Sequence, residues 1–292
     1  PVVQRAAWYY KDPELLWGAE LAGDRHTYTL GQPYNVGFEP RPAESHVGVS
    51  LSRLPKPCYD YIDHSPQYPV EPNLPWAVSF DKLAFRAGLD PEDQYMLLDG
   101  FGRGTHMHFD ANAIVRYSDG GEPLLVDGEY IKNAPKYHCS LAIMRNGQTD
   151  KTPAVTGLGL VADLDHYACT RTYLNNYSGS DWQRRILWRR GAYVLVLDTV
   201  TAKQAGDFTL RSCWRPWGDA QLDGGVLTVD HKPMRLVIAA GDAAPARLEN
   251  LKTVESLPVS RLSRQVGLSL QPGGEYRFWA EARSVEEYLQ RW

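Results

Sequence analysis

Polar residues that can bind metals or carry protons stand at every second position of GRGTHMHFDANAI, residues 102–114. The polar positions are His106, His108, Asp110 and Asn112, and the positions between them are Met107, Phe109, Ala111 and Ala113. Side chains alternate between the two faces of a β-strand. The spacing therefore predicts a strand with a polar row on one face and an apolar row on the core side. Imidazole and carboxylate groups on one face suit metal binding or proton transfer, so we expect a functional site here.

Two further ligand-type residues follow at distances typical of a strand and a turn. Asp127 ends the apolar run PLLVD, and His138 opens the next candidate strand, HCSLAIM. Taken alone, Asp127 fits a turn residue and His138 fits a polar residue at a sheet edge. With one histidine of the HxH pair they give two nitrogens and one oxygen, the ligand set of a zinc ion with an open position. The alternation does not decide which histidine of the pair binds the metal.

The elements that must position these residues are predicted to be short strands. Beyond residue 76 the chain alternates strand-like runs with turn sequences such as DGG, RNG and RGA. A dozen short strands without intervening helices predict a mainly β protein with a large antiparallel β-sandwich. The predicted strands are 76–80, 93–101, 112–118, 123–127, 138–144, 166–173, 184–190, 192–200, 207–214, 226–230, 234–240 and 275–282.

The first quarter of the chain has a different pattern. Residues 1–23 have apolar residues at helical spacing, and Asp12 is placed to cap a second short helix that starts at Pro13. So broad an apolar surface on a short segment requires other helices to pack against, and we expect the tail of an upstream helical domain. Residues 24–75 are predicted to be a connector with short strands such as HVGVSLS, and 76–292 to be the sandwich. The closing SVEEYLQRW fits a short helix.

Composition narrows the classes of partner. A net charge of −4 with no basic block argues against nucleic acid, and no apolar run approaches the ~20 residues of a membrane helix. The 9 Trp and 17 Tyr suit a β-rich core, although sugar-stacking surfaces would use the same residues. The four cysteines are far apart, and we expect buried thiols, with two disulfides as the alternative. They are Cys58, Cys139, Cys169 and Cys213.

The series HxHxD…D…H resembles a known family. The segment GTHMHFDANAIVRYSDGGEPLLVDGEYIKNAPKYHCSLAIMRNG is similar to the β-sandwich motif of the heparinase II/III-like polysaccharide lyases. The later DWQRRILWRRGAYVLVLDTV, with Asp198 near its end, resembles a second pattern of that family. The resemblance covers roughly residues 76–240, and residues 1–23 are similar to the last helix of the family's (α/α) toroid. The sequence departs from the pattern where GEY follows Asp127 and where Cys139 follows His138.

The resemblance implies roles for individual residues. His106 would face the substrate cleft and take part in proton transfer, while His108, Asp127 and His138 would bind one zinc ion that orders the site. Arg103 is placed to bind a substrate carboxylate bidentately, although a solvated loop arginine fits its position equally well. Asn112 is assigned to the same substrate surface.

The implied activity is cleavage of a uronic-acid-containing polysaccharide by β-elimination. In the family, the toroid supplies a tyrosine and an asparagine or histidine from across the cleft. The helical segment of this chain is too short to hold them, so we expect an upstream toroid domain and a site that is half built in this chain. The resemblance also implies a periplasmic or secreted protein, and a homodimer is left open.

Two other functions compete with a lyase. A non-catalytic carbohydrate-binding β-sandwich with a structural zinc would explain the same ligand residues. A cupin-type metalloenzyme would explain the opening GFGRGTHMH, but the glutamate that cupins place a few residues after HxH is missing. Asp110 is too close to the histidines, and residues 111–113, which follow it, contain no glutamate.

Overall fold

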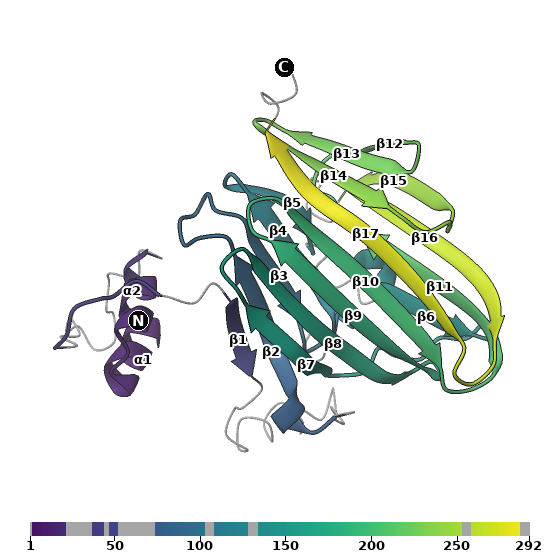
Figure 1. Ribbon diagram of the computed structural model, residues 1–292, viewed down its shortest axis with the longest axis horizontal. Helices are drawn as coiled ribbons and strands as arrows, with labels where there is room; N and C mark the ends of the chain where they lie inside the picture. The colour runs from purple at the N-terminus through teal and green to yellow at the C-terminus, as the bar shows by residue number, and fades with distance from the viewer. Residues whose placement is uncertain are drawn as a thin grey trace. The chain divides into compact units, whose positions relative to one another are not determined.

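The computed structural model describes residues 2–21, 37–43, 47–51, 74–102, 108–127, 134–252 and 258–286. The chain divides into two compact units, Pro1–His46 and Val47–Trp292. The first contains two helices and the second contains the strands (Figure 1). The predicted mainly β architecture is confirmed, while the predicted domain limits at residues 23 and 75 stay predictions.

The two helices of the first unit are α1 (Val2–Tyr10) and α2 (Pro13–Leu21). Asp12 caps the second helix as predicted, because its Oδ1 accepts hydrogen bonds from the backbone N–H groups of Glu14 (2.8 Å) and Leu15 (3.2 Å). No helix in the described part of the chain is long and apolar enough to cross a membrane.

A large antiparallel sheet of 13 described strands dominates the second unit (Figure 1). Its order is β12-β13-β14-β17-β10-β9-β8-β7-β2-β3-β4-β5, and β1 pairs with β2. Its strands are β1 (Val47–Leu51), β2 (Ser79–Arg86), β3 (Tyr95–Asp99), β4 (Ala113–Asp119), β5 (Glu122–Val126), β7 (Thr156–Asp163), β8 (Tyr167–Tyr177), β9 (Ser180–Arg189), β10 (Tyr193–Ala202), β12 (Gln221–Asp223), β13 (Val226–His231), β14 (Met234–Ala240) and β17 (Glu275–Glu286).

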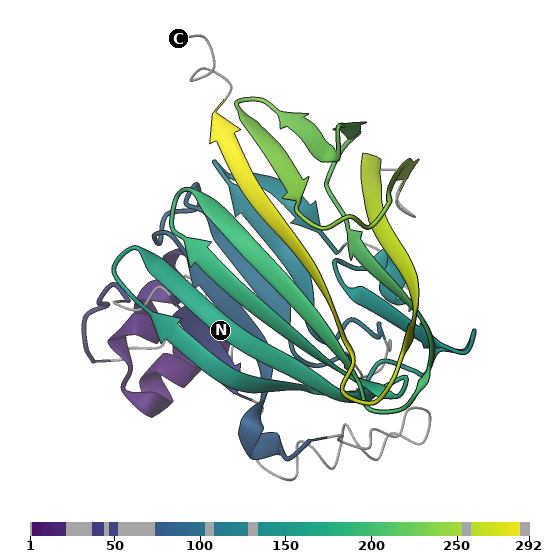
Figure 2. The same ribbon diagram turned by 45° about the vertical axis from the view of Figure 1, so that its right-hand side comes forward.

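A smaller four-stranded sheet packs against one face of the large sheet (Figure 2). Its order is β15-β16-β11-β6. Its strands are β6 (Leu141–Arg145), β11 (Gly206–Trp214), β15 (Ala246–Lys252) and β16 (Pro258–Leu270), and two short 3-10 helices, η1 (Trp76–Val78) and η2 (Pro135–Tyr137), complete the described elements. The two layers form the predicted β-sandwich.

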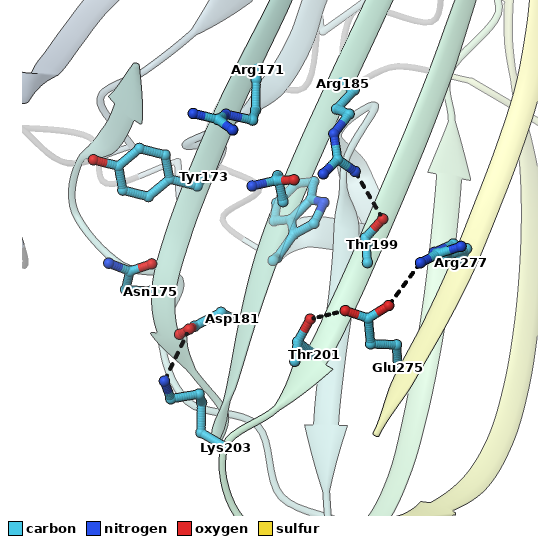
Figure 3. A pocket seen from close by; sticks show the side chains of 12 residues that line it. Arg171, Tyr173, Asn175, Asp181, Arg185, Thr199, Thr201, Lys203, Glu275 and Arg277 are labelled. Carbon is cyan, nitrogen blue, oxygen red and sulfur yellow. Dashed lines mark hydrogen bonds and ion pairs between the residues drawn. The ribbon is translucent and has the colours of Figure 1, made fainter. Parts of the chain in front are cut away.

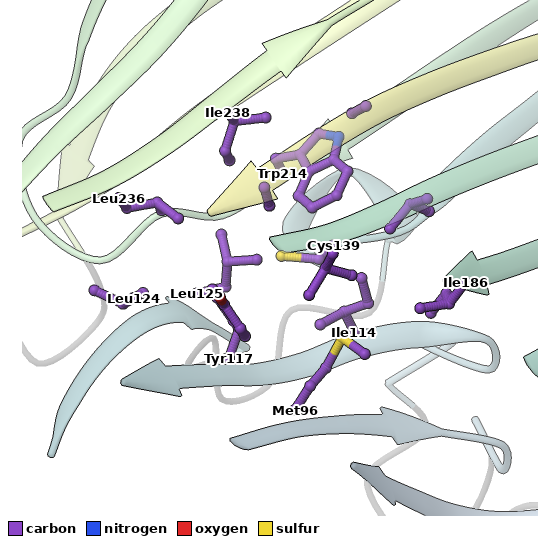
Figure 4. Close-up of a cluster of buried hydrophobic side chains, with 14 of the residues drawn as sticks. Met96, Ile114, Tyr117, Leu124, Leu125, Cys139, Ile186, Trp214, Leu236 and Ile238 are labelled. Atoms are coloured by element: carbon purple, nitrogen blue, oxygen red, sulfur yellow. The ribbon is translucent and has the colours of Figure 1, made fainter. Parts of the chain in front are cut away.

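Alternation along the strands places the core between the two sheets. On β9, Arg184 is buried and Arg185 is exposed, so these neighbours point to opposite faces of the sheet. The core cluster in Figure 4 joins large-sheet side chains such as Ile114 and Leu236 to Trp214 of the small sheet. Among the cysteines that the structure describes, Cys139, Cys169 and Cys213 are free thiols. Cys139 and Cys213 are buried, as predicted, whereas Cys169 is half-buried, and Cys58 lies outside the described residues.

Several strands of the structure are missing from the sequence prediction. β7, β12, β15 and β16 were not predicted, because β7 contains two glycines and β16 alternates serine and arginine with its apolar residues. The predicted terminal helix is wrong in its first turn, since 284–286 continue β17, where backbone pairing with β14 holds them. The remaining residues of that prediction, 287–292, lie outside the described ones.

Candidate metal centre

The segment that leads into β4 is a turn and not the predicted strand. Phe109 has φ 57° and Asn112 has φ 69°, both in the left-handed region, which breaks the two-residue alternation. The backbone N–H of Ala113 donates to the carbonyl of Asp110 at 2.8 Å and closes the turn. The strand begins only at Ala113. The expectation of one polar face running from residue 108 to residue 112 is therefore wrong.

The turn nevertheless brings together three ligand-type side chains. His138 Nδ1 lies 2.7 Å from both carboxylate oxygens of Asp127, and the two side chains are 0% and 5% exposed. Asp110 completes the group, because one ligand atom from each of the three residues lies within 4.8 Å of the other two. Asp127 and His138 are thus adjacent, as the sequence predicted.

Backbone hydrogen bonds fix the three residues relative to one another. The N–H of Asp127 donates to the carbonyl of Val115 on β4 at 3.0 Å. On the same strand, the N–H of Ile114 donates to the carbonyl of Cys139, the residue after His138, at 3.1 Å. Strand β4 therefore bonds to the segment of Asp127 and to the segment of His138, and it directly follows the turn that carries Asp110.

A buried arginine on β9, a more distant strand of the same sheet, joins two of these segments. Arg184 Nη1 donates to the carbonyls of Asn112 (2.6 Å) and Cys139 (3.2 Å). Its Nε and Nη2 donate to the two carboxylate oxygens of Asp198 at 2.8 and 2.9 Å. Because it clamps one carbonyl near Asp110 and one beside His138, Arg184 is a positioning residue for the cluster. The sequence indicated only that Asp198 ends an apolar strand.

Burial shapes the electrostatics of the cluster. Burial and then the charge of Asp127 raise the pKa of Asp110 to about 6, and burial and then the charge of Asp110 raise the pKa of Asp99 to about 7. Burial lowers the pKa of His138, but the hydrogen bond and charge of Asp127 outweigh it, so that pKa is raised. The site concentrates buried negative charge around one imidazole, which favours a bound cation.

The donor set fits a divalent metal ion. Two carboxylates and one imidazole are ligands that zinc accepts, and three protein ligands leave a position open. His138 Nε2 is buried, and no described residue makes a hydrogen bond of good geometry to it. A buried nitrogen without a partner is costly, and a metal ion or a further ligand group would satisfy it.

The other predicted site residues fall in different places. The half-buried ring of His108 lies 6.3 Å from that of His138, centroid to centroid, near the cluster but outside the group of close ligand atoms. Asn112 is fully buried, and its Oδ1 accepts a hydrogen bond from Thr172 Oγ1 at 2.6 Å. Its predicted substrate role stays a prediction. His106 and Arg103 lie outside the described residues.

Asp110 is the cluster residue that the sequence left without a metal-binding role. Its signal was present in the sequence, as the carboxylate two residues after His108. Regular strand alternation would place Asp110 in one row with the histidines, whereas the turn brings its carboxylate close to Asp127.

The two layers and their antiparallel order define the class of the fold, a large antiparallel β-sandwich. No family model and no curated protein matches the sequence. Solved structures do match. Heparan sulfate lyase HepC from Pedobacter heparinus aligns over 74% of this chain and 37% of its own length, with a TM-score of 0.58 and 16% identity. A heparinase III, the BT4657 gene product, aligns over 99% and 41%, with a TM-score of 0.66 and 12% identity.

A third solved structure aligns over the whole of its own length. The Slr1438 protein from Synechocystis aligns over 74% of this chain and all (100%) of its own, with a TM-score of 0.50 and 8% identity. At these identities the comparisons establish the shared fold. This chain spans 37% of the length of HepC and 41% of that of the heparinase III.

Proposed function

We propose that this chain is the metal-binding β-sandwich part of a polysaccharide lyase that cleaves a uronic-acid-containing polymer by β-elimination. The observation that carries the proposal is the buried group of Asp110, Asp127 and His138, which draws its members from the HxHxD…D…H series. The fold that surrounds this group resembles that of a heparan sulfate lyase and a heparinase III.

The chemistry of β-elimination suits the residue types available. The C5 proton of a uronate lies beside a carboxylate and is poorly acidic, so the enzyme must first neutralise that carboxylate. The guanidinium of Arg103 would do so through two hydrogen bonds. A base then removes the proton and an acid protonates the departing 4-oxygen, and His106 would serve in this proton transfer because an imidazole titrates near pH ~6.5.

A metal would have an ordering role in this proposal. Asp127 and His138 would hold a zinc ion, with Asp110 or His108 as the third ligand, and the bound ion would fix the turn before β4 against the segments after β5 and η2. Asp110 is included because its carboxylate lies within 4.8 Å of the ligand atoms of Asp127 and His138. His108 is included because the sequence resemblance assigns it to the metal.

The remaining parts of the proposal concern the whole protein. An upstream helical toroid would supply a tyrosine and an asparagine or histidine to the opposite side of the cleft. The protein would be periplasmic or secreted, where its acidic polysaccharide substrate occurs, and a homodimer is left open.

The proposal predicts product formation that depends on His106. The protein with its upstream region is incubated with heparan sulfate, dermatan sulfate and alginate, and the ultraviolet absorbance of the unsaturated product is followed. We expect at least one polymer to give product, His106→Ala to abolish it, and the exposed control His166→Ala to leave it unchanged. Binding without product from all polymers would contradict the lyase and favour the carbohydrate-binding alternative, and oxygen consumption would favour the cupin.

A further inference from the structure

The outer face of the large sheet carries a polar pocket that the proposed metal centre does not use. It has a volume of about 480 Å³ and lies over β8, β9, β10 and β17 (Figure 3). Arg184, which reaches the metal centre, points to the buried face of β9, whereas Arg185 lines the pocket from the exposed face. The pocket is therefore on the opposite side of the sheet from the metal centre.

Two arginines directly oppose each other at one end of this pocket. Arg171 of β8 pairs with Arg185 of β9 in the strand register, and both are exposed. Neither forms an ion pair with a described carboxylate, and their hydrogen bonds to Gly159 O and to Thr199 Oγ1 are both 3.5 Å long. Like charges directly across a strand pair destabilise a sheet. The guanidinium of Arg171 leans over Gly159 of β7 and that of Arg185 leans toward Thr199 of β10. An anion that draws both groups toward it would remove that cost.

Two aromatic rings on this face of the sheet each lie over a glycine. The ring of Tyr173 covers Gly157 of the neighbouring strand, and a Cβ at that glycine would overlap the ring. Trp279 covers Gly241 in the same way and is 45% exposed. Trp279 keeps nearly half of its surface exposed and Tyr173 is half-buried, so part of each ring stays accessible to solvent. Flat exposed rings of this kind can stack on the C–H face of a sugar.

The strand register aligns the two arginines with Trp279, and Tyr173 lies two residues further along β8. Arg185 of β9 pairs with Leu197 of β10, and Leu197 pairs with Trp279 of β17. The row from Arg171 to Trp279 thus crosses four strands, a span of about 14 Å at the usual strand spacing. This length suits a short oligosaccharide that lies across the strands.

The carboxylates of the pocket are already neutralised. Asp181 pairs with Lys203 at 3.5 Å and Glu275 pairs with Arg277 at 2.9 Å, both at the end away from the arginine pair (Figure 3). Asp181 is four residues before Arg185 on the same strand, about 13 Å away. The arginine end therefore keeps an uncompensated positive charge.

We propose that this outer face binds an acidic oligosaccharide, with a carboxylate or sulfate between Arg171 and Arg185 and sugar rings on Tyr173 and Trp279. The choice of an acidic polysaccharide as the ligand of this face rests on the proposed lyase function. The face would hold the polymer at a distance from the cleft.

Binding is measured by calorimetry in His106→Ala protein, so that turnover does not interfere. The probes are size-defined oligosaccharides of heparin and alginate, with neutral dextran and inorganic sulfate as comparisons. We expect Arg171→Gln/Arg185→Gln to weaken binding of at least one acidic oligosaccharide tenfold or more. Arg189→Gln, an exposed arginine on the same strand and face, should change it less than twofold. The double variant should unfold at the same temperature or a higher one, because a like-charge pair is removed.

Three results would overturn the site. The first is that neither acidic oligosaccharide binds, and the second is that the double variant binds with the same affinity as Arg189→Gln. The third is that dextran or free sulfate binds as tightly as the oligosaccharides. A lower unfolding temperature of the double variant would assign the arginines a structural role instead. None of these results alters product formation by wild-type protein, so failure of this site and failure of the lyase are distinguishable.

Discussion

At the scale of the residue, the sequence predicted that histidine and aspartate side chains lie together in one site. It did not predict which three of them have ligand atoms within reach of one metal ion. Asp127 and His138 were recognisable because each stands at the boundary of an apolar run, and the structure places them 2.7 Å apart. Asp110 was missed as a ligand because the left-handed φ of Phe109 turns the chain there, and a phenylalanine gives no warning of that conformation. Residue types predict chemistry, whereas local backbone conformation decides the ligand set.

The metal centre predicts that Asp110 contributes to metal affinity. Asp110→Asn should weaken zinc binding about tenfold or more, because it removes a charged ligand group within 4.8 Å of the other two. Zinc affinity is measured by competition with a chromogenic chelator, and His108→Ala is measured in parallel. Asp165→Asn, an exposed carboxylate, is the control. If Asp110→Asn binds zinc as tightly as wild type and His108→Ala binds it more weakly, the third ligand is His108 and not Asp110, as the sequence resemblance implies.

At the scale of the element, β9 and β10 hold the turns of the metal centre through a buried ion pair. Arg184 and Asp198 are 3% and 4% exposed, and Trp182 Nε1 also donates to Asp198 at 2.8 Å. The strands themselves were predictable from their alternation. Their contact with the turn at residue 112 was not, because 72 residues separate it from Arg184 and no local pattern encodes so distant a contact.

This buried pair predicts a large loss of stability when one partner is removed. Arg184→Met should lower the free energy of unfolding by about 3–5 kcal/mol, because it leaves the Asp198 carboxylate buried and uncompensated. Chemical denaturation measures the change. Arg184→Met/Asp198→Leu should recover part of the loss, and Arg185→Met on the exposed face should change stability by less than about 0.5 kcal/mol. Equal effects of Arg184→Met and Arg185→Met would show that the pair does not hold the strands.

At the scale of the whole molecule, the sandwich was predictable and its strand order was not. The run of short alternating strands indicates antiparallel sheets, as the structure confirms. The order places the last strand, β17, between β14 and β10 in the large sheet. Pairing between strands that are far apart in sequence depends on how whole faces pack, so alternation within single strands cannot reveal it.

The unfolding temperature with and without zinc tests the metal centre most directly. Zinc at 100 times its dissociation constant stabilises a folded protein by about 2.7 kcal/mol if the unfolded chain does not bind it. For a domain of this size each kcal/mol raises the unfolding temperature by about 2–4 °C, so we expect wild-type protein to unfold about 5–11 °C above the chelator-treated protein, as measured by calorimetry. Asp127→Asn should abolish the difference, and His166→Ala should preserve it. The same zinc shift in Asp127→Asn as in wild type, or no shift in either, would contradict a metal centre at Asp110, Asp127 and His138.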